Sequence, residues 1–390
     1  MVNSVAAEAV PAAAEKKSAS VIIIGGGIMA CATAYNLAKR GMNDIIVLEK
    51  VEIGNGGSCR NAGGVRQSAR DVRELPLAMY AVSNIWPTLS DELGVDVEYV
   101  QRGNIRMGKT EKHRETLTAL TEKSTKVGLD VKMITGDEAR EIIPLMSDEV
   151  TCASWCPTDG HANPLKTTTG FYLKALEAGV TFITGVTVTG IRKSKGRARY
   201  VDTDDGVYEG DNIMLCAGWY SRAIADTVGI DLPIIREFSE CLVTEMEPDM
   251  FPVMLGCAES DFYGSQTTHG SFVMGGNCGM EPYESERDRF ETNALTAPSL
   301  CRGIIRYFPS LKDIKVLRTW SGFYDVCKDH VPIIDNISEV PGLTIAAGFC
   351  GHGFGIAPAL GIAASELILD GESTTIDISG LRYDRFKAKA

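Results

Sequence analysis

The chain of 390 residues is 44% hydrophobic and 23% charged, a globular composition with room for two domains. Its net charge of −12 argues against nucleic acid or an anionic membrane surface as a partner. Its apolar runs have the length of strands, so we expect no transmembrane segment. Residues 1–18 lack the basic start and apolar stretch of a signal peptide, and we interpret them as a disordered tail of a cytoplasmic protein.

Cysteine and histidine spacing gives no sign of a metal site. Eleven cysteines are scattered without a CxxC pair, which favours reduced thiols over a disulfide framework. The five histidines, which show no zinc-ligand spacing, are His113, His161, His269, His330 and His352. We therefore predict that the protein binds no metal ion.

Residues 21–49 have the pattern of a dinucleotide-binding unit. The apolar run Val21–Ile24 predicts a strand, and a glycine turn, a helix and a second strand ending in Glu49 follow. Gly25 permits the tight turn, Gly27 lets the backbone approach a pyrophosphate, and Ala30 allows close helix–strand packing. The helix N-terminus favours phosphate, and Glu49 can accept hydrogen bonds from a ribose. The alternative is a βαβ unit with an ordinary tight turn.

A glycine-dense stretch with two arginines follows at residues 54–66. We interpret it as a loop that passes close to a flat cofactor, where side chains would clash. The alternative is a flexible surface loop.

The middle of the chain alternates between short helical and extended patterns. Helices are predicted at 71–96, 111–127, 138–143 and 165–178, and after residue 218 to about residue 228. Strands are predicted on both sides of a turn at Gly103 within 97–109, and at 152–155, 180–183, 186–191 and 213–218, with a hairpin turn at 202–206.

The last third begins with an antiparallel pattern and ends on a second strand–glycine–helix unit. Residues 231–280 alternate like antiparallel strands, a helix is predicted at 285–307, and a strand at 316–324. The strand 343–348 then leads into a glycine-rich turn and a helix of small residues at 356–369.

This order predicts a mixed fold class, α/β plus α+β. We expect a discontinuous Rossmann-like domain with an antiparallel-sheet substrate domain laid across it. The predicted nucleotide domain comprises residues 19–85, 150–225 and 325–390, and the predicted substrate domain comprises residues 86–149 and 226–324.

Four segments in this order resemble the D-amino-acid-oxidase-type FAD-dependent oxidoreductases, which include glycine oxidase, sarcosine oxidase and D-amino-acid dehydrogenase. The segments are Gly25–Ala30 with Glu49, the 54–66 loop, Cys216–Trp219 and Gly348–Gly355. The resemblance covers residues 20–370 and implies an FAD site.

The resemblance places the cofactor-binding role on particular residues. At the first glycine turn and second strand they are Gly25, Gly26, Gly27, Ile28, Met29, Glu49 and Lys50. In the glycine-dense loop they are Gly57, Ser58, Arg60, Asn61, Ala62, Gly63, Gly64 and Val65. Further along the chain they are Val188, Ala217, Gly218, Gly322 and Tyr324. In the last glycine turn they are Gly348, Gly351, His352, Gly353, Phe354, Gly355 and Ile356.

The loop at 58–66 and the turn at 159–164 resemble the β subunits of opine oxidase, hydrogen cyanide synthase and dye-linked proline dehydrogenase. This resemblance implies a hetero-oligomer with an iron–sulfur or second-flavin subunit as partner. It also implies hydride transfer to flavin N5 from the carbon that bears an amine.

Three positions depart from sarcosine oxidase. Gly322 stands where that enzyme has the cysteine that tethers its flavin, which favours non-covalent FAD, although Cys327 lies close by. Val273 and Met274 stand where it has a lysine that helps oxygen react, which favours a dehydrogenase. Gly355 replaces a lysine that grips the substrate carboxylate, so other groups must do so.

The candidate catalytic residues are Arg66, Tyr263, His269 and His352, with Arg106 and Tyr324 as weaker candidates for the pocket. Arg66 suits a carboxylate because its guanidinium can bind both oxygens. The alternative for Arg66 is a structural salt bridge or a flavin contact, and for Tyr263 it is a core tyrosine. For His269 the alternative is an exposed turn residue, and for His352 a structural or flavin contact.

Three hypotheses about function stay open at this point. The first is an FAD-dependent dehydrogenase for an opine, an N-alkyl glycine, proline or a D-amino acid. The second is a free-standing oxidase that makes hydrogen peroxide. The third is an FAD-holding electron-transfer subunit whose partner does the chemistry. A hydroxy acid or a polyol is a further substrate class, because a fold does not dictate a reaction.

Overall fold

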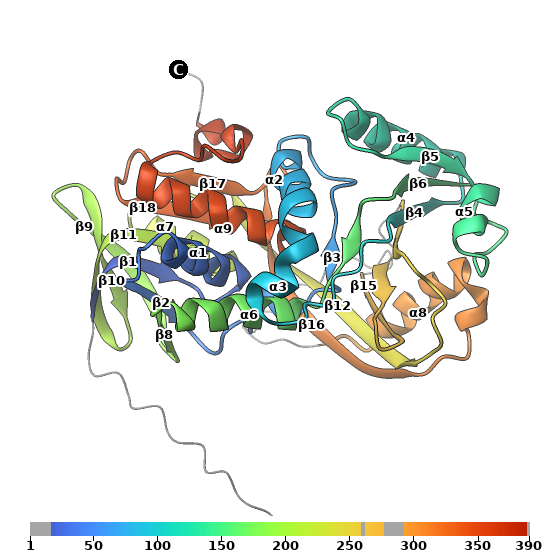
Figure 1. Ribbon diagram of the computed structural model, residues 1–390, viewed down its shortest axis with the longest axis horizontal. Helices are drawn as coiled ribbons and strands as arrows, with labels where there is room; N and C mark the ends of the chain where they lie inside the picture. Colours follow the sequence, from blue (N-terminus) through green and yellow to red (C-terminus); the bar gives the residue numbers. More distant parts are fainter. Residues whose placement is uncertain (1–16, 259–261, 277–291, 388–390) are drawn as a thin grey trace, which may run out of the picture.

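The computed structural model describes residues 17–258, 262–276 and 292–387. Two eight-stranded sheets lie side by side along the long axis of the molecule, and a two-stranded ribbon lies between them (Figure 1). This ribbon pairs β3 (Gly64–Val65) with β7 (Gly160–His161). The predicted tail at residues 1–16 lies outside the described residues, and Ser18 already belongs to the first strand.

The first sheet has the parallel centre that the dinucleotide-binding pattern predicts. Its main path runs β17-β18-β11-β1-β2-β8, and β9 and β10 extend it from β11. Its strands are β1 (Ser18–Ile24), β2 (Ile45–Glu49), β8 (Thr181–Thr184), β9 (Val188–Ser194), β10 (Arg197–Thr203), β11 (Gly206–Leu215), β17 (Ile333–Asn336) and β18 (Leu343–Ala347). β1 runs parallel to β2 and β11, so chain segments far apart in sequence meet at its carboxyl end.

The alternation along β1 explains how this sheet is covered on both faces. Val21 and Ile23 pack under the helices of one face, and Ile22 and Ile24 belong to the core of the other. The first face carries α1 (Ile28–Lys39), α6 (Pro164–Glu177) and α9 (Gly353–Asp370), as Figure 1 shows. The other face carries the short α7 (Ser221–Asp226).

Helices α1 and α9 pack closely because a glycine lies at their contact. A Cβ atom on Gly361 would lie 2.7 Å from the Ala32 carbonyl oxygen. By length and composition α9 is the one described helix that could cross a membrane, and 83% of its apolar stretch is buried inside the protein.

The second sheet is mostly antiparallel, in the order β16-β12-β15-β14-β13-β4-β6-β5. Its strands are β4 (Asn104–Gly108), β5 (Lys132–Thr135), β6 (Cys152–Cys156), β12 (Ile234–Met246), β13 (Met254–Cys257), β14 (Tyr263–Gln266), β15 (Ser271–Gly276) and β16 (Val316–Cys327). β4 and β13 are parallel neighbours. The helices α4 (Glu111–Thr125), α5 (Gly136–Ile142) and α8 (Thr296–Tyr307) lie at this end of the molecule (Figure 1).

The predicted helix at 71–96 is a chain of short turns. It contains α2 (Leu75–Tyr80) and α3 (Leu89–Leu93), joined by a wider π-type turn at Ala81–Ile85 and a tight 3₁₀ turn at Trp86–Thr88. Pro87 has no N–H to donate, which accounts for the break before α3.

Three other predicted elements differ from the structure. Residues 97–103 form no strand, and only Val100 makes an isolated bridge, to His161. The helix predicted at 285–307 begins at Thr296, because residues 292–295 are not helical and residues 285–291 lie outside the described residues. β6 pairs with β4 and β5, so residues 152–156 belong to the second sheet although the predicted nucleotide domain includes them.

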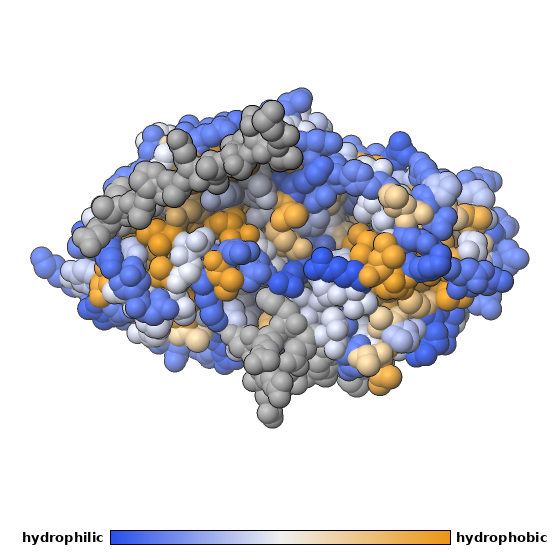
Figure 2. Space-filling view, turned by 90° about the horizontal axis from the view of Figure 1, so that it is seen from below, coloured by the Kyte–Doolittle hydropathy of each residue, from blue (hydrophilic) through white to orange (hydrophobic). Residues whose placement is uncertain are grey.

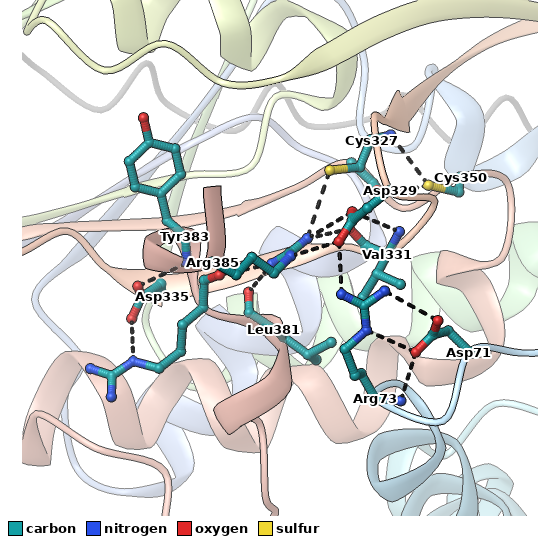
Figure 3. Close-up of polar contacts among 12 residues, drawn as sticks. Asp71, Arg73, Cys327, Asp329, Val331, Asp335, Cys350, Leu381, Tyr383 and Arg385 are labelled. Atoms are coloured by element: carbon teal, nitrogen blue, oxygen red, sulfur yellow. Dashed lines mark hydrogen bonds and ion pairs between the residues drawn. The ribbon is translucent and has the colours of Figure 1, made fainter. Parts of the chain in front are cut away.

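Arginine contacts fasten the C-terminal turns to the first sheet and the β16–β17 connection (Figure 3). Arg385 donates to Asp329 and to the Val331 carbonyl oxygen, and Arg73 reaches the same aspartate from before α2. The Tyr383 N–H donates to Asp335 in β17. The chain end is thereby held beside α9.

Candidate cofactor cavity and substrate site

A cavity of about 850 Å³ lies between the two large sheets and receives side chains from both. Its lining runs from Gly25 and Glu49 at the carboxyl end of the first sheet to Arg106 and Tyr263 on the second. The space-filling view in Figure 2 shows a surface hollowed near the middle of the molecule and bordered by apolar side chains.

The first glycine turn is held in a conformation that only glycine allows. Gly25 has φ +105°, and a Cβ there would lie 2.6 Å from the Cys216 carbonyl oxygen. The Glu49 carboxylate accepts hydrogen bonds from the N–H groups of Gly26 (2.6 Å) and Val51 (2.9 Å). These contacts fix the carboxylate at the cavity wall.

The glycine-dense loop crosses from the first sheet to the second. Ser58 Oγ accepts from the Ile28 N–H at the start of α1 (2.9 Å). Farther along the loop, the Arg60 carbonyl oxygen accepts from Trp320 Nε1 in β16 (2.9 Å). A Cβ on Gly322 would lie 3.2 Å from Arg60 Cβ, so the missing side chain lets loop and strand pass each other.

A buried charge network supports the turn before α9. Arg70 and Glu74 form an ion pair at 2.9 Å with both side chains 1% exposed. Arg70 also donates to the carbonyl oxygens of His352 (2.8 Å) and Arg66 (2.7 Å). Burial lowers the pKa of His352 more than the Glu74 carboxylate raises it, so its imidazole is neutral at pH 7. His352 therefore orients the turn without carrying a charge.

Asp325 lies at the cavity wall, where β16 meets the last glycine turn. Its carboxylate accepts from the Gly348 N–H at 2.5 Å. Burial raises its pKa to about 6, and hydrogen bonds from the Gly348 and Phe349 backbone offset only part of that rise. Asp325 is thus an acid whose charge changes near neutral pH beside the cavity.

The second sheet presents one row of residues across four neighbouring strands. Arg106 in β4 pairs with Gly256, Gly256 pairs with Tyr263, and Tyr263 pairs with Gly275. Residues in register point to the same face of a sheet, and Arg106 and Tyr263 both line the cavity. A Cβ on Gly275 would lie 3.0 Å from the Tyr263 ring, so that glycine makes room for the ring.

Arg66 follows β3 and its segment is anchored by a fully buried carboxylate. Asp159 accepts from the Gln67 N–H (2.7 Å), from Ser68 Oγ, and from Asn104 Nδ2 at 3.4 Å. Burial, helped by the charges of Arg106 and Arg70, lowers the pKa of Arg66 to about 10, so it stays protonated at pH 7. Asp159 is a positioning residue for Arg66.

Most predicted site residues lie on the cavity. Those that line it are Gly25, Gly26, Gly27, Ile28, Met29, Glu49, Lys50, Gly57, Ser58, Arg60, Asn61, Arg66, Val188, Ala217, Gly218, Tyr263, Gly322, Tyr324, Gly351, His352, Gly353 and Phe354. Those that lie behind the lining are Ala62, Gly63, Gly64, Val65, Gly348, Gly355 and Ile356.

His269 does not belong with these residues. It lies in the turn between β14 and β15, its side chain is 70% exposed, and its Nε2 is 3.0 Å from Glu98 Oε1. The structure therefore places His269 away from the cavity, in contrast to the catalytic role predicted for it. Cys327 is also outside the lining, because it is buried beside Cys350 and Arg385 (Figure 3).

Sequence reasoning missed Asp159, Asp325 and the Arg70–Glu74 pair. Asp159 could have been noticed, because it is the first residue of the turn at 159–164. No local pattern indicated that its carboxylate accepts hydrogen bonds from residues 67 and 68. The sequence indicated Arg106 only as a weaker candidate for the pocket, because its place in the sheet row depends on pairing between distant strands. No group of three His, Cys, Asp or Glu side chains in the described ranges could hold a metal ion.

The residues present fit an extended dinucleotide. The turn at Gly25–Gly27 leaves backbone N–H groups at the start of α1, and only glycine fits at Gly25. Nearby, Trp219 Nε1 is a buried donor without an acceptor in the described chain, which is expected where a ligand supplies one.

Comparison with known families decides which dinucleotide is bound. The family model described as FAD dependent oxidoreductase matches residues 20–367. The chain belongs to this family of FAD-dependent oxidoreductases. FAD is therefore the cofactor, and when bound it supplies the two-electron acceptor that no side chain provides.

Several relatives match this oxidoreductase over nearly their whole length. It is 28% identical to the beta chain of sarcosine oxidase from Arthrobacter sp, covering 93% of this chain and 90% of that one. It is 24% identical to a subunit of opine oxidase from Rhizobium meliloti, covering 94% and 97%. The crystal structure of L-proline dehydrogenase from P. horikoshii matches with a TM-score of 0.86 at 30% identity, covering 95% and 98%.

Proposed function

We propose that this oxidoreductase is an amino-acid dehydrogenase that oxidises the C–N bond next to a carboxylate. The observation that carries the proposal is Arg66, a protonated guanidinium at the cavity with no carboxylate partner among the described residues. A guanidinium in this setting binds a substrate carboxylate through two hydrogen bonds. Tyr263, on the facing sheet, helps to position the substrate.

The chemistry in this site is mainly positioning. Burial raises the pKa of Tyr263, so its hydroxyl stays protonated and can donate. Burial lowers the pKa of His352 and so makes it a weak base, and Glu74 is paired with Arg70. We therefore expect the substrate to bind with its amine already neutral. Holding the carboxylate also fixes the position of the adjacent C–H bond, which must face the flavin ring of bound FAD.

The names of the relatives support an amine substrate, since they act on sarcosine, an opine and L-proline. A dehydrogenase is favoured over an oxidase because Lys50 is the one lysine among the lining residues in the described chain. Lys50 packs over the Tyr220 ring near the first glycine turn, far along the lining from Arg106. Val273 stands where an oxygen-activating lysine is expected.

Three further parts of the proposal concern the cofactor and the assembly. We propose that FAD is bound non-covalently, because Gly322 has no side chain for a tether and Cys327 lies off the cavity. We also propose a second subunit as electron acceptor, supported by relatives named as subunits. A cytoplasmic location is proposed with them.

Anaerobic reduction of the FAD-loaded protein tests the reaction. Proline, N-methylglycine, opines and D-amino acids are mixed with the protein, and loss of the flavin's visible absorbance is followed. We expect at least one class to bleach the flavin, and expect an artificial dye to re-oxidise it faster than oxygen does. Rapid peroxide formation would favour the oxidase, and no bleaching by any amine would favour an electron-transfer subunit.

A pair of variants tests the role of Arg66. Arg66→Met should lower the second-order rate of flavin reduction by about 100-fold or more, because a charge-assisted contact to the carboxylate is lost. Arg102→Met is the matched control, since Arg102 is 60% exposed and pairs with Asp249 outside the cavity. Equal rates in the two variants would contradict the assignment of Arg66.

A further inference from the structure

Two arginine side chains reach the substrate end of the cavity, and neither has an acidic partner among the described residues. Arg66 Nη1 makes one long hydrogen bond, 3.5 Å to the Ser68 carbonyl oxygen. Arg106 Nε is buried and has no acceptor in the described part of the chain. In the part of the chain that the structure describes, no carboxylate lies within ion-pair distance of either guanidinium.

The nearest acid is already engaged. Asp159 influences the pKa values of both arginines, yet its carboxylate is occupied by the Gln67 N–H, the Ser68 hydroxyl and N–H, and the Asn104 amide. Its hydrogen bonds hold the segment that carries Arg66, and within the described ranges it forms no ion pair with either guanidinium.

Arg70 is a buried structural arginine of the same region, and it differs from Arg66 and Arg106 because each of its guanidinium nitrogens has an acceptor. Its three guanidinium nitrogens bind Glu74, the His352 carbonyl oxygen and the Arg66 carbonyl oxygen. A buried cation is costly unless it is paired in this way. Arg66 and Arg106 lack such pairing among the described residues. We therefore expect a ligand to supply the anionic groups that pair with them.

The two charges are also close enough to affect each other. Burial is the largest cause of the lowered pKa of Arg66, and the charge of Arg106 is the next. Burial likewise lowers the pKa of Arg106. A ligand with two negative groups would offset the cost of burying both guanidinium groups and the repulsion between them. A ligand with a single carboxylate would leave one of the two guanidinium charges without a counter-charge.

We infer that the preferred substrate is a secondary amine with two carboxylates, an iminodiacid, with one carboxylate on Arg66 and the other on Arg106. This inference rests on the proposed function and narrows its substrate class. Arg106 then acts as the specificity-determining residue, held at a fixed point of the sheet row by its pairing with Gly256 and Ser154.

The reaction of such a substrate balances with FAD and water alone. The carbon between one carboxylate and the nitrogen loses a hydride, and the nitrogen loses a proton, giving a C=N bond. FAD takes the two electrons and, with solvent, the two protons. Water then adds to the C=N bond and breaks it, releasing a 2-oxo acid and the amine of the remaining half.

The first experiment measures flavin reduction without oxygen for matched pairs of substrates. Iminodiacetate is compared with N-methylglycine, and N-(carboxymethyl)alanine with N-methylalanine. We expect the diacid of each pair to have a second-order rate constant about 100-fold higher. A diacid that reacts no faster than its monoacid would overturn the inference.

Variants of Arg106 assign this preference to one side chain. In Arg106→Met the ratio of diacid to monoacid rate constants should fall by about 100-fold, and in Arg106→Lys it should be partly retained because the charge is kept. Arg102→Met, with its exposed side chain, should leave the ratio as it is. An unchanged ratio in Arg106→Met, with FAD content and melting temperature kept, would overturn the inference.

A binding measurement with inert analogues needs no turnover. Thiodiacetate has sulfur in place of the amine and two carboxylates, and methylthioacetate has one carboxylate. We expect thiodiacetate to shift the flavin spectrum with a Kd about 30-fold lower, and expect Arg106→Met to remove the difference. Equal affinities would overturn the inference.

Failure of this inference is distinguishable from failure of the proposed function. If monoacids bleach the flavin and diacids do not, the dehydrogenase stands and the iminodiacid preference is wrong. If no amine of either kind bleaches it, both are wrong.

Discussion

Single carboxylates decide much of the geometry at this site, because each is held by its own set of donors and does a different task. Asp159 gathers the donors that hold the Arg66 segment. Glu49 closes the first glycine turn, and Glu74 neutralises Arg70. Asp325 differs from the others because burial raises its pKa, and the Gly348 N–H that it accepts from offsets only part of that rise.

Replacing Asp159 tests its positioning role. Asp159→Ala should destabilise the fold by about 2–4 kcal/mol, because several buried donors lose their acceptor at once. The variant should also weaken binding of carboxylate substrates while FAD affinity stays near that of the parent. Denaturant unfolding and substrate titration measure the two effects, and Asp249→Ala, an exposed site, is the control. A stable variant with unchanged substrate affinity would contradict this role.

The raised pKa of Asp325 predicts that the stability of the fold depends on pH. Its folded pKa of about 6 lies above the ordinary value of about 4, so its contribution to stability is fully present below pH 4 and is lost as the pH rises through 6. The loss amounts to about 3 kcal/mol. Compared with Asp325→Asn, the parent should therefore lose relative stability between pH 4 and pH 6. Parallel pH dependence in both proteins, measured by unfolding with saturating FAD, would rule this out.

At the scale of elements, the C-terminal turns after α9 depend on Arg385. Burial raises the pKa of Asp329, but hydrogen bonds and charge from Arg385, with help from Arg73, hold it at about 2. Arg385 is 14% exposed and also donates to the Val331 and Leu381 carbonyl oxygens (Figure 3). One side chain thus joins three segments.

Removing that side chain should loosen the chain end. Arg385→Met should lower the free energy of unfolding by about 2–3 kcal/mol, since a partly buried carboxylate and two carbonyl groups each lose a donor. Arg382→Met is the control, because its contact to Asp335 is long (3.4 Å) and its side chain is 57% exposed. We expect that control to cost under about 1 kcal/mol. Equal losses in both variants would show that the buried contacts add nothing.

At the scale of the whole molecule, the cavity lies between the two large sheets. The 55–61 loop fastens to β16 through Arg60, and residues from both sheets share one lining. We expect FAD bound along this lining to contact both sheets, so that its binding energy would also hold them together.

Differential scanning calorimetry tests this coupling. FAD at about 100 times its Kd should raise the free energy of unfolding by about 2.7 kcal/mol. We expect a single transition with FAD and an earlier, broader or split transition without it. A melting profile that is the same with and without FAD would contradict the coupling.

The local units were predictable because their signals are local. Gly25, Glu49 and the apolar alternation of Val21–Ile24 lie within one short segment, and so does the glycine turn before α9. Periodicity and glycine chemistry therefore determine the parallel sheet, its covering helices and the cofactor end of the cavity. These features also carry the resemblance that implied FAD, which the family match confirms.

The substrate end was decided only by tertiary structure. Arg106 meets Tyr263 through the register of β4, β13 and β14, and Asp159 reaches Ser68 across 91 positions of sequence. The exposed turn of His269 and the place of β6 in the second sheet have the same origin. Strand pairing determines which distant side chains share a face of the sheet, and burial then shifts their pKa values. A local sequence pattern therefore predicts neither the shared face nor the charge.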